Sequence, residues 1–348
     1  MKNIGEIDKN FKAQAGISKE NVRFYPVPSE RMHLYGVFVE NGKFRRMPET
    51  VAKTVSCGVY ELHAHTAGGR VRFKTDSSYV AIYAKMPVIY KMGHFALCGS
   101  GGFDIYADND YVKSYIPAPS ISDEYQGVVD IIGERRVRDI TINLPLYSEV
   151  SELFIGLEDN AVLESPNPYR IEKPICFYGS SITQGGCASR PGTAYNAIVS
   201  RYFDADIVNL GFSGNAKGEV EIGDYIKGLD MSAFVYDYDF NAPNNEHLKS
   251  THERMFLQIR EANPTLPIVI MSKPKWNRMP ADLDRLDTIR KTYENAVTRG
   301  DKNVYFIDGK SLMSLCENEG TVDGTHPTDL GFFSMARELI SVLEKILN

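Results

Sequence analysis

The chain has 348 residues, of which 43% are hydrophobic and 24% charged, and its formal net charge is −6. Because it shows neither a basic stripe nor a run of about 18–20 apolar residues, we expect no nucleic-acid partner and no membrane span. The five cysteines are scattered and form no CxxC pair, so the sequence predicts neither structural zinc nor a disulfide framework.

The first half of the chain has the pattern of a β domain. Its N-terminus, MKNIGEIDKNFKAQ, lacks the apolar core of a signal peptide, so we expect a cytoplasmic protein, or a secreted or periplasmic one if a leader has been removed. Residues 31–158 carry short strand patterns, with a hairpin signal at Asn41–Gly42 and two strands around Asp76–Ser78. This pattern predicts an antiparallel, jelly-roll-like β-sandwich, and the three prolines of 163–174 indicate a linker.

The second half alternates between strands and helices. Apolar strand patterns cover 175–178, 206–210, 233–238, 267–271 and 304–307, and helical patterns cover 193–203, 245–262, 281–298 and 327–347, with a short helix after the second strand. Buried strands that are each followed by a helix predict a doubly wound parallel sheet. An apolar stripe marks the last helix: Phe333, Ala336, Leu339, Ile340, Leu343 and Leu347. We therefore expect a sandwich domain with linker at 1–170 and an α/β domain at 171–348.

Polar residues follow the predicted parallel strands, at the sheet edge where sites of this fold class lie. The first strand runs into FYGSSITQG, in which Ser180 and Ser181 are adjacent. This is either an ordinary Gly-Ser turn or a nucleophile on a strand-to-helix turn, which needs a base to remove its proton. His326 offers a base, and Asp323, three residues earlier, offers the carboxylate that orients it. Pro327 is expected at the first position of the last helix. The local sequence of Asp323 and His326 fits a capping motif equally well.

Two further strand ends carry candidate donors for an oxyanion. Gly214 follows the second strand in VNLGFSGNA, and Asn241 follows the third in VYDYDFNAPNN. Each of these residues alone is typical of a turn. Together with the serine, aspartate and histidine they favour a single site built from residues far apart in the sequence.

These residues resemble the four blocks of the SGNH, or GDSL-type, hydrolases, which here read GSSIT, NLGFSGN, DYDFNAP and DGTH over residues 175–348. The resemblance implies a flavodoxin-like fold and a serine esterase that needs no cofactor. It makes Ser181 the nucleophile, His326 the base and Asp323 the residue that orients it. The implied oxyanion donors are the Gly214 N–H, Asn241 and the Ser181 N–H.

The chain departs from this family pattern at three positions. Ser180 stands where the family usually has an aspartate, Asp239 stands in place of a glycine, and Ala242 stands in place of a second aspartate. These replacements argue against membership of the commonest, lipase-like branch of the family. The GxSxG elbow of α/β-hydrolases is not met, because Thr183 stands where its second glycine would be.

The first half also resembles a known domain. The segments TAGGRVRFKTDS and GSGGFDIYAD are similar to the sandwich domain that precedes some bacterial SGNH domains, and Gly102 to Tyr106 match its Gly-x-Asp-(Leu/Ile)-Tyr signature. Related two-domain proteins deacetylate carbohydrates, so the resemblance implies carbohydrate esterase activity as a class. The glycine-rich loop either brings Asp104 and Tyr106 to the substrate or only makes turns.

Other residues are candidates for substrate contact. Arg190, between the nucleophile and the first helix, either reaches the substrate or pairs with an acid. Trp276 follows the fourth strand and is expected to stack on a sugar face. Tyr178 and Tyr238 are alternatives for that role if they do not belong to the core.

Three histidines are candidates for metal binding. His63 and His65 in ELHAHT would share one face of a strand, and His94 could join them. Since no carboxylate or cysteine completes the set, we expect structural histidines and no metal.

The sequence thus predicts a serine esterase that removes short acyl groups, chiefly acetyl, from a carbohydrate or similar polyol, so its partner would be a small-molecule or oligosaccharide ester. The strand-end loops are polar or glycine-rich and offer no apolar lining for a long acyl chain. Two alternatives stay open: a non-catalytic carbohydrate-binding protein on a decayed hydrolase scaffold, and a lipase or thioesterase for longer acyl chains. The oligomeric state is not predicted.

Overall fold

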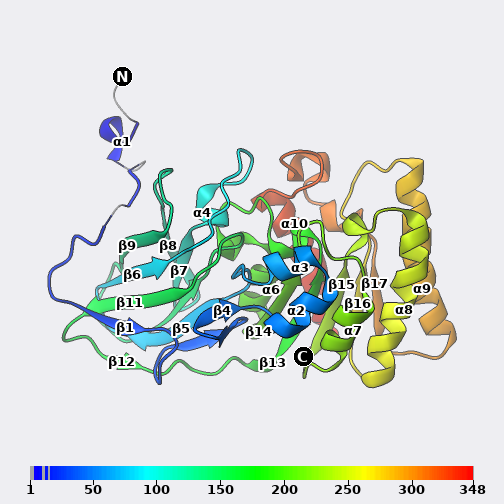
Figure 1. Cartoon of the computed structure of the whole chain (residues 1–348), viewed down its shortest axis with the longest axis horizontal. Coiled ribbons are helices and arrows are strands. Elements are labelled where there is room, and N and C mark those ends of the chain that lie inside the picture. The colour runs from blue at the N-terminus through cyan, green and yellow to red at the C-terminus, as the bar shows by residue number, and fades with distance from the viewer. Residues whose placement is uncertain (1–3, 10–11, 15, 348) are drawn as a thin grey trace.

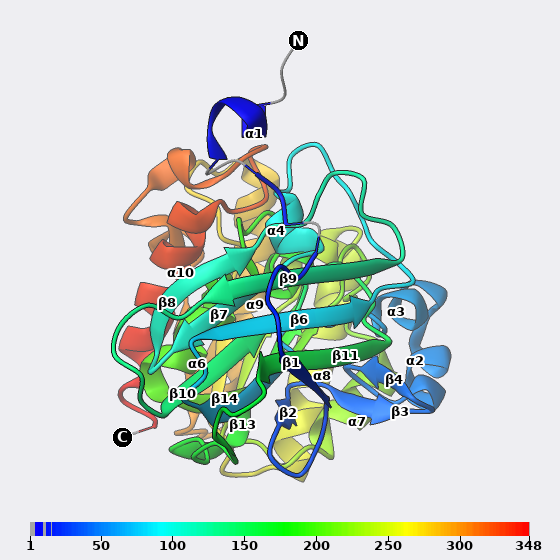
Figure 2. The same ribbon diagram turned by 90° about the vertical axis from the view of Figure 1, so that its left-hand side faces the viewer.

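The computed structural model describes residues 4–9, 12–14 and 16–347. Figures 1 and 2 show an N-terminal β-sandwich packed against the side of a layered α/β unit. This is the fold class that the sequence predicts. Within the described part of the chain, no helix combines the length and the apolar composition needed to cross a bilayer.

Two antiparallel sheets packed face to face form the body of the N-terminal domain, and a separate two-stranded sheet adjoins them. One has the order β1-β11-β6-β9, formed by Val22–Pro26, Glu152–Glu158, Tyr79–Lys85 and Glu124–Asp130. The other has the order β12-β5-β10-β7-β8, formed by Leu163–Glu164, Arg70–Thr75, Arg138–Asn143, Phe103–Ala107 and Asp110–Tyr115, with β2 (His33–Tyr35) also paired to β5. Inward-facing residues such as Phe73, Ile82, Ile142 and Ile155 form the core between the sheets.

Turns decide how these strands connect. Asn41 and Gly42 have φ angles of 51° and 74°, the left-handed backbone that joins β3 (Phe38–Glu40) to β4 (Lys43–Arg45) in the predicted hairpin. Strands β5 and β6 flank Asp76–Ser78 as predicted, but they belong to different sheets, so this turn carries the chain across the sandwich.

Four short helices of the first half were not predicted: α1 (Ile4–Ile7), α2 (Glu49–Val55), α3 (Cys57–Leu62) and α4 (Leu97–Ser100). Helices α2 and α3 pack on the α/β domain, where Ala52 and Val59 join its core. The expectation that His63 and His65 share a strand is wrong. His63 caps the end of α3, and His65 lies beyond it in a single β-bridge with Glu149.

The C-terminal domain is built on a parallel sheet of order β14-β13-β15-β16-β17. Its strands are β13 (Ile171–Gly179), β14 (Ala205–Gly211), β15 (Ala233–Asp237), β16 (Ile268–Met271) and β17 (Val304–Ile307). In order of sequence this is 2-1-3-4-5, the flavodoxin-like arrangement. The strand order reverses at β13, and ligands of such sheets bind beyond the carboxyl ends of the strands at that point.

Helices cover both faces of the parallel sheet (Figure 1). Helices α6 (Tyr195–Phe203) and α10 (Asp329–Leu343) pack on one face, and α7 (Val220–Lys227), α8 (Asn245–Ala262) and α9 (Pro280–Thr298) pack on the other. Short helical turns lie in the connections: α5 (Ser181–Gln184), η2 (Pro191–Thr193), η3 (Asp239–Asn241), η4 (Ser311–Met313) and η5 (Glu317–Gly320).

The segment expected to be a linker is partly built into the two domains. Leu163–Glu164 forms strand β12 on the sandwich, and β13 begins at Ile171, four residues before the predicted start at 175. Residues 165–170 make the crossing between them.

The last helix begins two residues later than predicted. Thr328 is its N-cap, and Pro327 lies before the cap in a β-bridge with Thr321, where extended backbone excludes a helical turn. Its apolar stripe is also shifted at the start, because Phe333 is exposed and Phe332 is buried. Both phenylalanines fit a 3.6-residue period, so the pattern alone did not separate them.

A buried carboxylate joins the two domains. Asp104 on β7 has no exposed surface, and its Oδ1 accepts a hydrogen bond of 2.7 Å from Asn143 Nδ2 of the sandwich. Its Oδ2 accepts bonds of 2.8 Å from Arg190 Nη1 and from the Gly192 N–H, both in the C-terminal domain. The Arg190 guanidinium also donates to the Tyr106 hydroxyl. The signature residues of the sandwich therefore hold the loop that follows the first parallel strand.

Replacing Asp104 with alanine should destabilise the protein, because Arg190 and the Gly192 N–H would lose their buried partner. Removing one partner of a buried ion pair costs about 3–5 kcal/mol. Chemical denaturation measures the loss, with Glu152→Ala as control, since its pair with Lys85 is exposed and worth at most about 1 kcal/mol.

If Asp104→Ala proves as stable as the parent protein, the domain-joining role is wrong. If the variant folds but loses activity on a sugar ester more than on a small artificial ester, Asp104 also serves the substrate.

Candidate active site

The two adjacent serines after β13 have different environments. Ser180 is fully buried and caps α5, where its Oγ accepts a hydrogen bond of 3.2 Å from the Ile182 N–H. Ser181 is 8% exposed and starts the helix. Gly179, the last residue of β13, allows the close approach of β15, since a Cβ there would overlap the Asp237 carbonyl oxygen. Ser180 therefore serves as the helix cap, and Ser181 is the serine that reaches the surface of the site.

Ser181 begins a chain of hydrogen bonds that ends at a carboxylate. Its Oγ lies 3.0 Å from His326 Nε2, and His326 Nδ1 lies 2.7 Å from Asp323 Oδ2. Asp323 Oδ1 also accepts bonds from the His326 and Thr325 N–H groups at 2.7 and 3.0 Å. Partial burial alone would raise the pKa of Asp323, but these bonds lower it to about 2. The carboxylate is therefore ionised and fixes both the backbone and the ring of His326.

Candidate oxyanion donors lie at the Ser181 turn and at the ends of the two strands that flank β13. Gly214 is exposed, has a φ of 70° that favours glycine, and its N–H has no hydrogen-bond partner within the described residues. The same holds there for the Ser181 N–H. Asn241 Oδ1 accepts a bond of 3.3 Å from the Ala216 N–H, which leaves its Nδ2 as a donor. Three N–H groups are thus available at the ends of β13, β14 and β15.

The sandwich domain supports the loop of one of these donors, Gly214. Gln184 is buried, and its Oε1 accepts a 3.0 Å bond from Ser213 N–H, next to Gly214. Its Nε2 donates to His65 Nδ1 at 3.1 Å. Burial lowers the pKa of His65 to about 3, so this ring is neutral and accepts the bond. His65 is therefore a structural residue, as predicted, although not on a strand.

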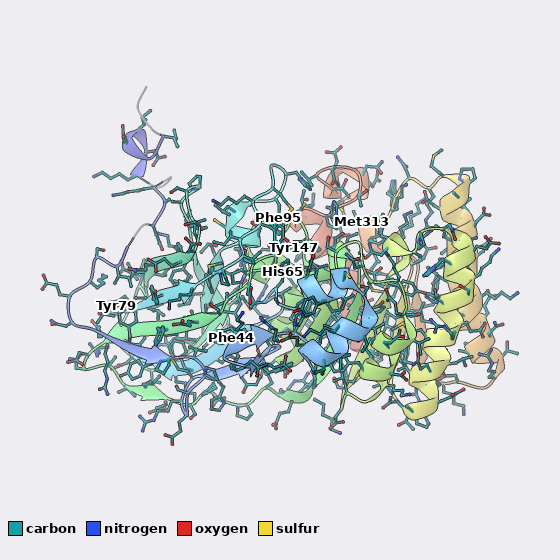
Figure 3. All side chains as sticks on the ribbon, viewed as in Figure 1. Phe44, His65, Tyr79, Phe95, Tyr147 and Met313 are labelled. Atoms are coloured by element: carbon teal, nitrogen blue, oxygen red, sulfur yellow. The ribbon has the colours of Figure 1, made fainter. Side chains whose placement is uncertain are left out.

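Arg46 is another residue of the sandwich domain that reaches the site. It is 2% exposed and donates to the Asn209 and Gly211 carbonyl oxygens at 3.0 and 2.7 Å, at the end of β14. Tyr147 donates to the Ser181 carbonyl oxygen at 3.3 Å. Figure 3 places His65, Phe95 and Tyr147 together at the junction of the domains.

Asp239 accounts for one departure from the family pattern. It is 2% exposed, and its carboxylate accepts bonds from Arg285 Nε at 2.7 Å and from the Lys273 N–H at 3.1 Å. Arg285 Nη2 also donates to the Ala242 carbonyl oxygen at 3.1 Å. This ion pair fixes the η3 turn that carries Asn241.

The fold and this site define an ester-hydrolysing enzyme. Residues 172–344 match the GDSL-like lipase/acylhydrolase family, and residues 22–163 match the N-terminus of esterases of the SGNH hydrolase type. The chain belongs to the SGNH (GDSL-type) hydrolases, in their two-domain form with a GxDLY sandwich.

Solved structures share this two-domain architecture. A protein from Bacteroides ovatus ATCC 8483, assigned as a GDSL-like lipase, is 28% identical over 94% of this chain and 98% of its own, with a TM-score of 0.84. The salicylyl-acyltransferase SsfX3 of a tetracycline biosynthetic pathway is 20% identical over 95% and 100%, with a TM-score of 0.76. A family two carbohydrate esterase from Clostridium thermocellum, in complex with cellohexaose, is 15% identical over 81% and 93%, with a TM-score of 0.59. No curated protein matches the chain significantly.

The residues predicted to contact substrate lie in different places. Asp104, Tyr106 and Arg190 form the domain junction, so Arg190 pairs with an acid, the second of the two roles considered for it. Trp276 is partly buried, with the Lys310 ammonium 4.5 Å from its ring centroid.

The two tyrosines proposed for sugar stacking belong to the core. Tyr178 and Tyr238 are each 1% exposed. The Tyr238 hydroxyl is bonded to Thr251 Oγ1 at 2.6 Å, so neither ring is available to a sugar. The sequence left this outcome open, and it follows from the cover of helices on both faces of the parallel sheet.

The three histidines considered for a metal do not come together. His63 is bonded to the Tyr60 carbonyl oxygen, and His65 to Gln184. His94 lies instead beside the candidate catalytic residues, with its Nε2 3.9 Å from Asp323 Oδ2.

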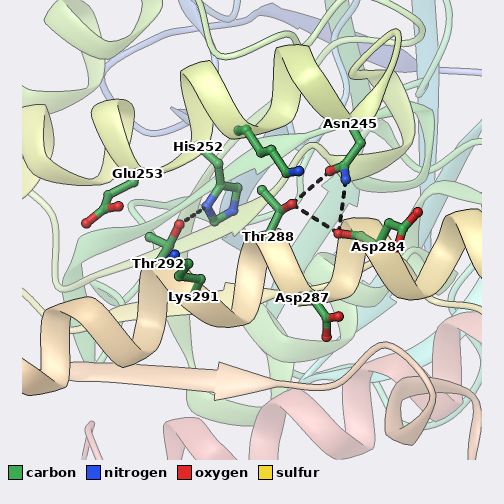
Figure 4. A pocket seen from close by; sticks show the side chains of 9 residues that line it. Asn245, His252, Glu253, Asp284, Asp287, Thr288, Lys291 and Thr292 are labelled. Carbon is green, nitrogen blue, oxygen red and sulfur yellow. Dashed lines mark hydrogen bonds between the residues drawn. The ribbon is translucent and has the colours of Figure 1, made fainter.

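A separate hollow of about 550 Å³ lies between α8 and α9 (Figure 4). Its lining includes Asn245, bonded to Thr288 Oγ1 at 2.8 Å, and His252, bonded to Thr292 Oγ1 at 2.8 Å. No residue of the Ser181 site lines it. These bonds join the two helices, so we assign the hollow a structural origin.

Replacing Ser181 and Ser180 separately tests the two serine environments. Ser181→Ala should lower turnover on an ester by about 10⁴–10⁶, as in other serine hydrolases. Ser180→Ala should leave turnover much closer to the parent and cost about 1 kcal/mol of stability through the lost cap. Steady-state kinetics and thermal unfolding of both variants give the two numbers, and equal losses of turnover would reverse the assignment.

Proposed function

We propose that the protein is a serine esterase that removes short acyl groups, chiefly acetyl, from a carbohydrate or similar polyol ester. The observation that carries the proposal is the hydrogen-bonded chain from Ser181 Oγ through His326 to Asp323, at the same sheet edge as three N–H groups that have no hydrogen-bond partner among the described residues. A decayed, non-catalytic scaffold has no reason to keep all of these groups in place.

The first half of the reaction forms an acyl-enzyme. Ser181 Oγ attacks the acyl carbonyl carbon while His326 Nε2 takes the hydroxyl proton. Asp323 stabilises the imidazolium, and the N–H groups of Ser181, Gly214 and Asn241 bind the developing oxyanion. Collapse of the tetrahedral intermediate breaks the bond to the alcohol oxygen, which leaves with the proton from His326.

The second half releases the acid. A water molecule gives a proton to His326 and attacks the acyl carbon, and the same donors bind the oxyanion again. Collapse returns the proton to Ser181 and frees the carboxylic acid. An alcohol in place of water would make the reaction an acyl transfer, so the acceptor decides between hydrolysis and transfer.

Several observations support a short acyl group on a hydrophilic alcohol. The loops at the strand ends carry polar or small residues, such as Ser189, Asn215 and Lys217. Beside such residues, an added methylene would not gain the ~0.8 kcal/mol that burial on an apolar surface supplies. Structures of the same two-domain architecture include the family two carbohydrate esterase bound to cellohexaose and an acetyl xylan esterase from Butyrivibrio proteoclasticus.

A series of p-nitrophenyl esters from two to twelve acyl carbons tests the chain-length claim. We expect kcat/KM to be highest for acetate and to fall at least about tenfold by octanoate, because the longer chain gains no burial. Ser181→Ala gives the background for each ester. A maximum at eight carbons or more would favour a lipase or thioesterase. If acetate is the best substrate, acetate release from a panel of acetylated sugars identifies the alcohol.

A further inference from the structure

We infer that the edge of the active site holds a binding site for a soft divalent cation of the zinc class, formed by His94, Cys187 and His326. The three side chains each offer one ligand atom, and these atoms all lie within 4.8 Å of one another. They come from both domains and from three separate loops, which is why the sequence showed no metal motif. Metal binding at this site does not depend on the proposed esterase function. Only the inhibition that we expect from the bound metal rests on that function.

His94 is carried by a turn of the sandwich domain whose next residue, Phe95, belongs to a core cluster of the C-terminal domain. The Phe95 N–H donates to the Met92 carbonyl oxygen at 3.3 Å, which closes the turn. Phe95 is 4% exposed and packs edge-on against Tyr147, with ring centroids 5.2 Å apart. The His94 side chain itself is 45% exposed, so its ring can rotate to meet an ion.

Cys187 is held by the tight loop after the nucleophile helix. Its φ of 76° is left-handed, and the Ala188 N–H that follows donates to the Gly185 carbonyl oxygen at 3.2 Å. The Gly186 N–H donates to the Ser181 carbonyl oxygen at 2.7 Å. Phe95 and Ala188 belong to the same buried cluster, so the loops that carry His94 and Cys187 are packed together.

His326 already has the arrangement of a metal-binding histidine. Its Nδ1 is bonded to the Asp323 carboxylate at 2.7 Å, the contact that orients many zinc-bound imidazoles through their second nitrogen. The nitrogen left for a metal is Nε2, the atom that lies 3.0 Å from Ser181 Oγ. A bound cation therefore occupies the lone pair that accepts the serine proton, and it inhibits the esterase.

The donor set selects among cations. Two imidazole nitrogens and one thiolate suit Zn²⁺ and Co²⁺, whereas Mg²⁺ and Ca²⁺ require oxygen ligands. Ligand atoms around tetrahedral zinc lie roughly 3.5 Å apart, which a rotation of the exposed His94 ring can supply. On binding, the thiol of Cys187 gives its proton to solvent, and water fills the fourth position.

Titration with Co²⁺ tests the site without any need for activity. A cobalt–thiolate bond gives a charge-transfer band in the near ultraviolet, which we expect for the parent protein and for Ser181→Ala. Cys187→Ser should abolish the band, and His94→Ala should weaken Co²⁺ binding by about tenfold or more. Cys57→Ser is the matched control, since Cys57 is an exposed free thiol outside the site, and it should leave the band unchanged.

Zn²⁺ inhibition of ester hydrolysis is the second readout. The parent enzyme should be inhibited reversibly, with recovery on adding a chelator, and Mg²⁺ should have no effect. His94→Ala and Cys187→Ser should keep metal-free turnover and raise the Zn²⁺ inhibition constant by about tenfold or more. A parent protein without the cobalt band, or a band that survives Cys187→Ser, overturns the proposal. A protein that shows the band and hydrolyses no ester keeps the metal site and refutes the esterase.

Discussion

The buried carboxylate of Asp104 is the contact on which the site depends. It ties β7 of the sandwich to Arg190 and Gly192, in the loop between α5 and α6. In the same loop, Ser189 N–H and Thr193 Oγ1 donate to Asp329 Oδ1 at 2.8 and 2.7 Å. Asp329 is the first residue of α10, and His326 lies just before that helix. One buried charge of the first domain therefore fixes, through a short series of bonds, the position of the candidate base in the second.

The sandwich domain is accordingly part of the active-site structure rather than an appended module. Arg46 holds the end of β14, and His65 holds Gln184, which in turn holds the loop of Gly214. Tyr147 contacts the backbone of Ser181 itself. An N–H donor stabilises an oxyanion best when it is already in position before the negative charge develops. These contacts restrict the loops that carry the donors. The same packing brings His94 beside Cys187.

Local features of the site could be predicted from the sequence, whereas long-range contacts could not. Ser181 lies two residues beyond a buried strand, and Asp323 and His326 are three residues apart, so short motifs were enough to single them out. Asp104 and Arg190 were both singled out, and pairing with an acid was one of the two roles considered for Arg190, but nothing local shows that Asp104 is that acid. The helical segment before His63 was missed because its core lies on the other domain. Pairs such as Gln184 with His65 carry no sequence signal at all, since only the fold brings them together.

Activation of Ser181 by His326 is tested most directly by mass spectrometry after brief exposure to a fluorophosphonate, which reacts covalently with activated serines. The structure predicts one adduct per chain, mapped to Ser181, and labelling of His326→Ala slower by about 100-fold or more, because general-base assistance is lost. An adduct on Ser180, or equal labelling rates for the parent and His326→Ala, would contradict this account.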